Sequence, residues 1–276
     1  MPVHPLSRRP ERPALLPWVQ RLWLHAAIHS PVAARELCLP SAMTRLVLRL
    51  EGQAMRSFRG VQDRRGVPHA RLQYAGLRHR SLLRSAADSG VSVGVDLKPG
   101  ASLALFGQPA DRLAGCHLDL LDLLPARLRS GFAALQRMPA DAALLDRLED
   151  LLLACLEGRD TALLQCERWD ETLAALTGGT PVLALAATSG LSHRVWLQRF
   201  RAALGCTPRA WRELARFERA LPALREQPHR PLAELALDLG FHDQAHLSRQ
   251  FAAHAGIGPA RYRRWGGPWM QHLPLD

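Results

Sequence analysis

The last hundred residues contain a degenerate internal duplication. The first copy has Leu185, Ala186, Gly190, Trp196, Phe200, Gly205, Pro208 and Trp211, and the second has Leu235, Ala236, Gly240, Leu247, Phe251, Gly256, Pro259 and Tyr262. The two copies are offset by 50 residues up to the first glycine and by 51 residues from Trp196 and Leu247 onward. Matching anchors at a fixed offset indicate one structural unit built twice.

Each copy has the pattern of a helix-turn-helix unit. A small residue, Ala186 or Ala236, stands where a second helix must cross closely. Four residues later a glycine, Gly190 or Gly240, can adopt the positive φ that ends a helix. Two short helices joined by a tight turn are therefore predicted in each copy.

The second helix of each copy is predicted to have a capped start and one buried face. Ser192 and Asp243 are good N-caps. The pairs Trp196 with Phe200 and Leu247 with Phe251 have the i, i+4 spacing of one helix face. Closing glycines and the prolines that follow as stop signals are Gly205, Pro208, Gly256 and Pro259. The opposite face is polar and can contact base edges or phosphates, with Arg194, Gln198, Gln244, Ser248 and Arg249.

The segment between the copies is predicted to be a connecting helix, Arg209–Gln227. About 18 residues at roughly 1.5 Å each give about 27 Å. Successive major-groove segments on one side of DNA lie about 34 Å apart. Such a helix can hold two recognition helices about one turn of DNA apart, although Pro222 should end or kink it.

The charge of the chain agrees with a polyanionic partner. The formal net charge is +11 over 276 residues, and Lys98 is the only lysine among 36 basic residues. Arginine suits bidentate contact with phosphate and guanine, although a GC-rich genome also explains its abundance. A hydrophobic share of 47% excludes a disordered chain. Composition does not choose among nucleic acid, an acidic membrane surface and an acidic protein.

Two segments carry a resemblance to a known family. Leu191–Pro208, LSHRVWLQRFRAALGCTP, and Leu239–Arg263, LGFHDQAHLSRQFAAHAGIGPARYR, resemble the double helix-turn-helix domain of AraC-type transcriptional regulators. The resemblance covers about residues 180–265. It implies base-facing roles for Arg194, Leu197, Gln198, Gln244, Ala245, Ser248 and Arg249.

Leu197 and Ala245 stand where the family usually has polar residues, so they can contact a thymine methyl group or no base. Arg261, Arg263 and Arg264 lie just past the second unit and are expected to contact the DNA backbone. The full set of predicted DNA contacts is Ser192, Arg194, Leu197, Gln198, Arg201, Gln244, Ala245, Ser248, Arg249 and Arg261.

The first part of the chain is predicted to be β-rich from residue 18 to about 106. Strand character is present in Val19–Ala26, Arg45–Leu50 and Val91–Leu97, and Lys98-Pro99-Gly100 is typical of a turn. Residues 51–90 have an irregular pattern, which does not indicate how any strands among them pair. Helical spacing follows in Pro109–Ala114, Leu118–Leu124, Leu128–Met138 and Ala140–Leu156.

The last of these helices has an apolar stripe that favours core packing over a dimer seam. Its members are Leu144, Leu145, Leu148, Leu151, Leu152 and Cys155. Leu16–Trp23 and Gly94–Gly107 also resemble, more weakly, the β-rich N-terminal domain of one branch of the same family. That resemblance implies a sensor or dimerisation domain and no particular ligand.

These predictions combine into an α+β chain of two domains. A flexible, proline-rich arm covers residues 1–17, an effector or dimerisation domain 18–177, the double helix-turn-helix domain 178–265, and a tail 266–276. Gly178-Gly179 marks the domain boundary. No apolar run approaches a membrane span and no signal peptide is present, so a cytoplasmic location is expected.

Several residues could bind a metal or an effector, but an ordinary structural role is favoured for each of them. His242 and His246 are four apart, but a cap at Asp243 places His242 outside the helix, so a metal pair is disfavoured. His69 and His79 are expected on the surface. Trp18, Trp23 and Phe106 can line an effector pocket, but core packing is favoured.

Other patterns argue against an enzyme or a metalloprotein. The five cysteines, Cys38, Cys116, Cys155, Cys166 and Cys206, form no Cys-x-x-Cys pair and fit reduced thiols. Cys116 and Cys155 are expected in the core rather than in a redox role. Asp119 and Asp122 fit a solvated helix face. No phosphate-binding glycine loop or His-Glu-x-x-His motif is present, and neither a catalytic residue nor a cofactor is predicted.

The sequence thus favours a sequence-specific DNA-binding regulator. Double-stranded DNA is the expected partner, with a small effector, a homodimer and RNA polymerase as further candidates and no membrane. Two alternatives stay open: a small-molecule enzyme tethered to DNA by its C-terminal domain, and a protein that coats DNA without sequence preference.

Overall fold

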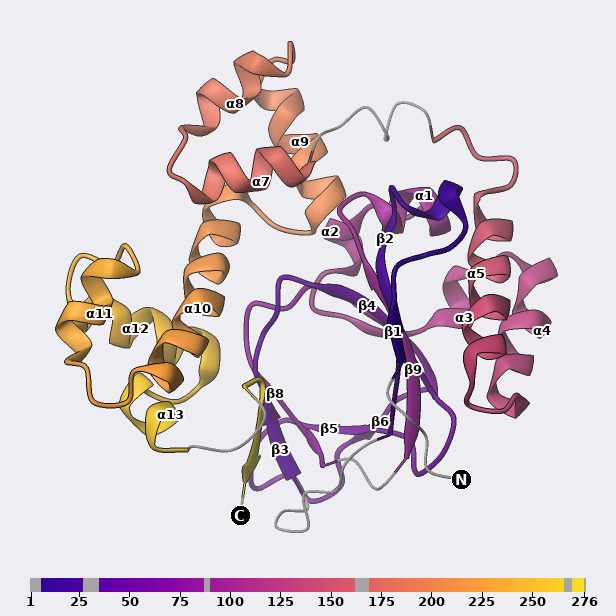
Figure 1. Ribbon diagram of the computed structural model, residues 1–276, viewed down its shortest axis with the longest axis horizontal. Helices are drawn as coiled ribbons and strands as arrows, with labels where there is room; N and C mark the ends of the chain where they lie inside the picture. Colours follow the sequence, from indigo (N-terminus) through magenta and orange to yellow (C-terminus); the bar gives the residue numbers. More distant parts are fainter. Residues whose placement is uncertain (1–5, 27–34, 87–89, 162–168, 266–269, 276) are drawn as a thin grey trace.

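The computed structural model describes residues 6–26, 35–86, 90–161, 169–265 and 270–275. Figure 1 shows strands and flanking helices in the first part of the chain and a run of helices beside them in the second. This arrangement confirms the predicted α+β class, with helix-turn-helix units in the C-terminal part.

The larger sheet is antiparallel and has the strand order β1-β2-β9-β4-β7-β10. Its strands are β1 (Leu6–Arg8), β2 (Val19–Ala26), β4 (Thr44–Arg49), β7 (Leu72–Ala75), β9 (Val91–Leu97) and β10 (His117–Asp119). The bounds of β2 and β9 are those predicted, and β4 begins and ends one residue earlier. Alternate residues of these strands, such as Leu22 and Val93, are buried in one core because successive side chains point to opposite faces.

The smaller sheet has the order β11-β3-β8-β5-β6. Its strands are β3 (Arg35–Cys38), β5 (Arg56–Phe58), β6 (Val67–Pro68), β8 (Leu82–Ser85) and β11 (His272–Leu275). β11 follows the second helix-turn-helix unit and pairs antiparallel with β3, from His272 opposite Cys38 to Leu275 opposite Arg35. The prediction of a tail after residue 265 is therefore wrong for the described residues 272–275, which form a strand.

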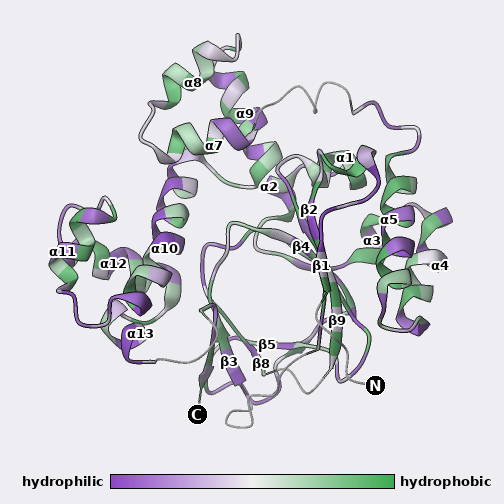
Figure 2. Ribbon diagram, viewed as in Figure 1, coloured by the Kyte–Doolittle hydropathy of each residue, from purple (hydrophilic) through white to green (hydrophobic). Residues whose placement is uncertain are grey.

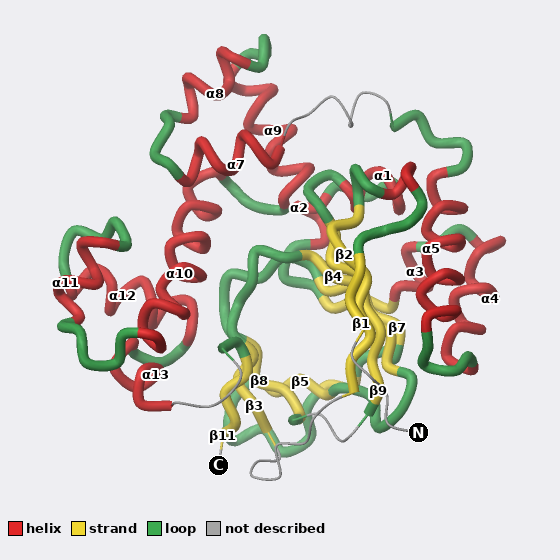
Figure 3. The backbone as a smooth tube through the Cα atoms, in the orientation of Figure 1, coloured by secondary structure: helices red, strands yellow, loops and turns green. Residues whose placement is uncertain are grey.

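The helices of the first part are η1 (Pro13–Leu15), α1 (Ala101–Phe106), α2 (Ala110–Leu113), α3 (Leu120–Leu123), α4 (Ala126–Ala134), η2 (Leu135–Arg137) and α5 (Ala142–Leu156). Helices α3, α4 and α5 lie against the larger sheet on the side away from the second part, as the tube in Figure 3 shows. Helices α1 and α2 lie instead next to the second part. All six residues of the predicted apolar stripe on α5 are buried in the core they share with β2 and β9, which confirms the core interpretation.

Two expectations for this region need correction. The predicted helix Leu118–Leu124 begins only at Leu120, because residues 117–119 pair with β7 as β10. Asp119 therefore lies in a strand and caps α3 by accepting from the backbone N–H of Leu121 at 3.0 Å, rather than sharing a helix face with Asp122. Helix α1 was not predicted, because its apolar residues were assigned to the β-rich segment.

The N-terminal segment is fixed to the first part by a buried carboxylate. Residues 6–8 form strand β1, and the side chain of Glu149 on α5 accepts from the backbone N–H groups of Glu11 at 2.9 Å and Arg12 at 3.0 Å. Arg8 forms an ion pair with Glu149 at 2.9 Å. The prediction of a flexible arm over residues 1–17 is wrong for residues 6–17; residues 1–5 lie outside the described residues.

The second part consists of helices around a second core, to which Leu39 and Leu77 of the first part also belong. They are α7 (Trp169–Thr177), α8 (Val182–Thr188), α9 (His193–Leu204), α10 (Pro208–Glu226), α11 (Leu232–Asp238), α12 (Gln244–Ala255) and α13 (Pro259–Trp265). Helix α7 packs against α8 and α10, and its Trp169 and Leu176 belong to this core. Residues 169–177 therefore pack with the C-terminal helices, although the sequence placed them before the boundary at 178. Among the described residues, no helix combines the length and apolar character that crossing a membrane requires.

Candidate nucleic-acid interface

The first helix-turn-helix unit is formed by α8 and α9. Gly190 has φ +69°, which ends the first helix as predicted, and Ser192 caps α9 by accepting from the backbone N–H of Val195 at 3.4 Å. Trp196 and Phe200 are buried with ring centroids 5.2 Å apart. These local features hold α9 against α8 and leave the other face of α9 outward.

The second unit, α11 and α12, repeats this construction. Gly240 has φ +79°, and the carboxylate of Asp243 accepts from the backbone N–H of His246 at 2.6 Å. Phe251 packs against Phe217 of α10 and Tyr262 of α13, with ring centroids 5.0 and 5.4 Å apart. The predicted caps, turns and buried residues of both units are thus confirmed.

Helix α10 joins the two units and is continuous from Pro208 to Glu226. Pro208 begins this helix rather than only stopping the previous one, a place where its missing N–H costs nothing. Pro222 does not end the helix. Nineteen residues correspond to about 28 Å, so the units lie at opposite ends of a helix of nearly the length predicted. Figure 1 shows α8 and α9 at one end of α10 and α11 to α13 at the other.

Most of the predicted DNA contacts are exposed on the recognition helices. The exposed members of the set are Arg194, Gln198, Arg201, Gln244, Ala245 and Arg249, with Ser192 at the start of α9 and Arg261 on α13. Among the described residues, the guanidinium groups of Arg194 and Arg249 have no hydrogen-bond or ion-pair partner. Figure 2 shows hydrophilic stretches along the ribbons of both units. Each unit therefore presents an unpaired arginine to solvent.

Two members of the set are less accessible. Leu197 is half-buried and packs against the C-terminal core, and Ser248 is also half-buried. Arg263, expected near the DNA backbone, instead donates to the carbonyl oxygen of Arg230 at 2.8 Å and connects α13 to the loop before α11.

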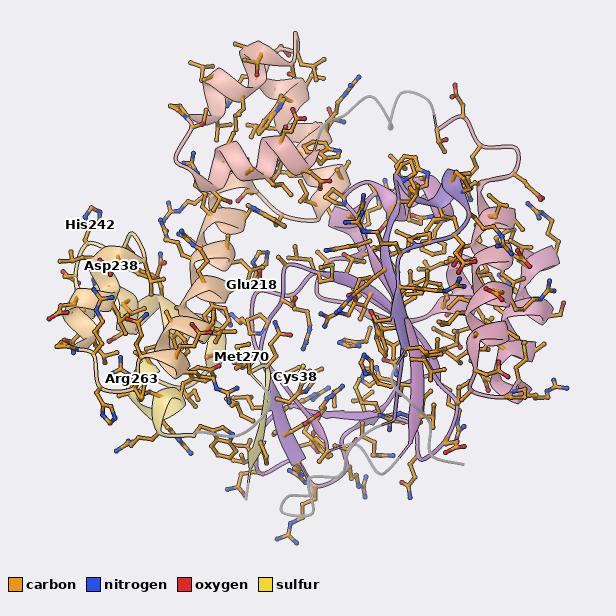
Figure 4. All side chains as sticks on the ribbon, in the orientation of Figure 1. Cys38, Glu218, Asp238, His242, Arg263 and Met270 are labelled. Carbon is orange, nitrogen blue, oxygen red and sulfur yellow. The ribbon has the colours of Figure 1, made fainter. Side chains whose placement is uncertain are left out.

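His242 and His246 lie together, which the sequence did not predict. The backbone N–H of His242 donates to His246 Nδ1 at 3.2 Å, and the two rings stack with centroids 5.5 Å apart. Figure 4 shows His242 at the outer edge of the second unit. Within the described ranges no three His, Cys, Asp or Glu side chains gather where they could hold a metal ion.

A cavity of about 660 Å³ lies where the first part meets the C-terminal helices. Its lining includes Lys98 and Pro99 after β9, Thr44 at the start of β4, and Ala203 and Trp211 from α9 and α10. Among the described residues Lys98 has no ion-pair partner. The cavity therefore borders both the β-rich part and the first recognition helix.

The aromatic residues considered for an effector pocket divide into two groups. Trp18 and Phe106 are buried in the N-terminal core, which confirms core packing for both. Trp23 is half-buried on the other face of the sheet, where its indole N–H donates to Asp96 at 3.3 Å. Arg21 and Arg45 pair with the same buried carboxylate at 2.5 and 2.9 Å. The sheet face turned away from the core is thus polar and charged.

The expectations for the other histidines and cysteines are partly wrong. His69 and His79 are half-buried rather than on the surface, and His69 is hydrogen-bonded to Ser57 at 2.7 Å. Cys155 is buried as predicted, but Cys116 is only half-buried. Cys166 lies outside the described residues.

Cys38 of β3 has an unusual environment. Burial would raise the pKa of its thiol, but the nearby charges of Arg84, His272 and Arg78 outweigh burial and lower that pKa to about 7. Burial raises the pKa values of Cys155 and Cys206 to about 12. Of these three cysteines, the one whose thiol pKa is lowered is Cys38, which lies beside arginines in the sheet that β11 completes.

Sequence reasoning did not single out Glu218 of α10. Its carboxylate accepts from the backbone N–H of Ala42 at 2.8 Å, and Figure 4 shows it on the side of α10 that faces the strands. A carboxylate bound to a distant backbone N–H has no signature in the sequence. The contact shows that the linker helix itself is attached to the first part.

The comparisons with known proteins agree with this geometry. A family model described as a helix-turn-helix domain matches residues 185–264. The HTH-type transcriptional regulator MtrA of Neisseria gonorrhoeae is 28% identical over 83 residues, which are 30% of this chain and 27% of that protein. The HTH-type transcriptional regulator VirS of Mycobacterium tuberculosis is 28% identical over 204 residues, 73% of this chain and 53% of that protein. The chain thus matches between about a quarter and about half of the length of these curated relatives.

Among solved structures, ToxT of Vibrio cholerae O395 is similar with a TM-score of 0.44 and 9% identity, over 91% of this chain and 97% of that one. A similarity at this level carries no argument about function.

Proposed function

We propose that the protein is a sequence-specific transcriptional regulator of the AraC type, because residues 185–264 match the family model of a helix-turn-helix domain. In this proposal α9 and α12 enter two successive segments of the major groove. The observation that carries it is the pair of equivalent helices at the two ends of α10, each with an exposed and unpaired arginine. Arginine matches the acceptor pattern of guanine in the major groove.

The role of the first part is also a proposal. Residues 18–177 would bind a small effector or a second copy of the chain, and residues 178–265 would bind DNA in the cytoplasm. The cavity of about 660 Å³ supports an effector, because a ligand there would touch both the β-rich part and α9. Its size is within the range of small-molecule sites. A homodimer, a contact with RNA polymerase and the lack of catalytic activity remain predictions from the sequence.

Arg249→Ala tests base reading by the second unit. The variant should bind a cognate site more weakly by about 1–3 kcal/mol and should tolerate any base at one position of that site. Fluorescence anisotropy on the cognate site and on single-base variants of it, at fixed salt, measures both effects.

Arg64→Ala is the matched control, because it removes the same charge from an exposed loop of the first part. It should leave affinity and base preference nearly unchanged. An equal loss by Arg249→Ala on every DNA sequence would make Arg249 a phosphate contact and would favour binding without sequence preference.

A further inference from the structure

The two recognition helices are attached to the first part at equivalent positions of the duplicated sequence. The backbone N–H of Gly100 donates to the carbonyl oxygen of Ala203 near the end of α9 at 3.0 Å. The backbone N–H of Ser81 donates to the carbonyl oxygen of His254 near the end of α12 at 2.8 Å. Ala203 and His254 are 51 residues apart, the same offset that relates Trp196 to Leu247.

These carbonyls are ones that an α-helix leaves without an internal partner. The last four carbonyl groups of a helix receive no N–H from within it, and Ala203 and His254 fall in that last turn. Both residues are buried, so an unpaired carbonyl there would carry a desolvation cost. The first part supplies the missing donor in each unit, which gives the contact an energetic reason.

The closing glycines of the two helices lie at the same contacts. A Cβ placed on Gly205 would lie 2.9 Å from the carbonyl oxygen of Ala110 in α2, and a Cβ on Gly256 would lie 3.3 Å from Ser81 Oγ. At the turn glycines Gly190 and Gly240, an added Cβ would meet nothing within 4 Å. Of these four glycines, only the two at the C-terminal ends of the recognition helices are closely approached by the first part.

The second contact has additional support. His254 Nδ1 donates to the carbonyl oxygen of His79 at 2.7 Å, so both the backbone and the side chain of His254 bind the segment before β8. Strand β11 then pairs with β3, and His272 lies 3.3 Å from Glu36 in an ion pair if its ring is protonated. The second unit is therefore attached to the smaller sheet before and after α13.

We propose that the first part is a two-point clamp that fixes the spacing of the two recognition helices. One point is the Gly100 turn on α9, and the other is the segment around Ser81 on α12. Because the spacing of the two helices is fixed, the protein selects DNA sites whose two blocks are separated by one particular distance. This consequence rests on the proposed function. The cavity is lined by Lys98, Pro99 and Ala203 at the first point and by Ala42 and Glu218, but not by Ser81 or His254. A ligand bound there would therefore act on the first point and on the contact of α10, and not on the second point.

The clamp can be tested without DNA. Spin labels are placed at Leu183 on α8 and Leu237 on α11, whose side chains are 67% and 63% exposed, in a full-length chain with Cys38, Cys116 and Cys166 changed to serine. The thiols of Cys155 and Cys206 remain, since they are buried and protonated at neutral pH. The distribution of distances between the two spin labels, measured by pulsed electron paramagnetic resonance, should be narrow in this protein.

Two pairs of variants then test the two contacts one at a time, and each pair consists of a variant that disrupts the contact and a matched control. Gly205→Ala introduces the clash with Ala110, and Gly190→Ala introduces the same left-handed alanine without a clash. Ser81→Pro removes the donor to His254, and Ser81→Ala retains it. The first member of each pair should broaden or shift the distribution, and the second should not. An unchanged distribution in both Gly205→Ala and Ser81→Pro would mean that α10 alone sets the spacing, which overturns the clamp.

A second readout links the clamp to DNA. Changing the separation of the two blocks by one base pair rotates one block by roughly 35° about the DNA axis. The wild-type chain should prefer the original spacing by about tenfold or more, and the released variants should prefer it by less than about threefold. If a variant with a broadened spin-label distance distribution still preferred the original block spacing as strongly as the wild type, the clamp would not set the spacing of the DNA site. If no DNA site is found at all, the proposed function fails, while the distance measurement still decides whether the clamp exists.

Discussion

A protein in which Arg194 and Arg249 are both replaced by alanine should bind its cognate site more weakly by roughly 2–6 kcal/mol, which is a loss of about 30-fold to 10⁴-fold. Each arginine alone should cost about 1–3 kcal/mol. The two losses should add, because the residues lie on separate helices joined by α10 and neither has a partner among the described residues. Titration of the cognate DNA with the two single variants and the double variant measures the sum.

The double variant shows whether both helix-turn-helix units contact base edges or only one of them does. If only one unit contacts base edges, the double variant should bind no more weakly than the weaker single variant. Unfolding midpoints of all three variants serve as the control, and they should match the wild type because both side chains are exposed. If the double variant lost much less binding free energy than the two single variants lose together, at an unchanged unfolding midpoint, the two units would not read DNA independently.

Replacing Glu149 by leucine should lower the free energy of unfolding by about 3–5 kcal/mol. The Glu149 side chain is fully buried, accepts from two backbone N–H groups and pairs with Arg8. Leucine would leave the N–H groups of Glu11 and Arg12 and the guanidinium of Arg8 without this partner, and unpaired polar groups in a low-dielectric site are costly. Urea denaturation followed by circular dichroism measures the change.

Asp150→Leu is the neighbouring control. Asp150 accepts from Arg12 at the surface, and an exposed ion pair contributes little because water screens it. This variant should keep an unfolding midpoint close to that of the wild type. If Glu149→Leu were as stable as Asp150→Leu, the N-terminal segment would not be held by Glu149.

The sequence predicted the C-terminal units well because their determinants are local. Caps such as Ser192 and Asp243, and glycines at positive φ, act within a few residues of their place in the chain. The strands β2 and β9 were also predicted with correct bounds, since alternating β-branched and apolar residues identify a half-buried strand.

The features that the sequence did not predict depend on partners far away in the chain. Strands β1 and β11 are three and four residues long, and each forms by pairing with the edge of another strand, β2 for β1 and β3 for β11. The contacts of Gly100 and Ser81 with the recognition helices use backbone atoms, which every residue carries. Leu197 looked base-facing by position, but whether such a residue is half-buried depends on the packing of neighbouring helices.

The most direct test of the account is a selection of binding sites from random DNA with the full-length protein near physiological salt. The account predicts an enriched motif with two blocks about one helical turn apart, one block for each recognition helix. Enrichment of a single block, or binding with no enriched motif, would contradict reading by two recognition helices.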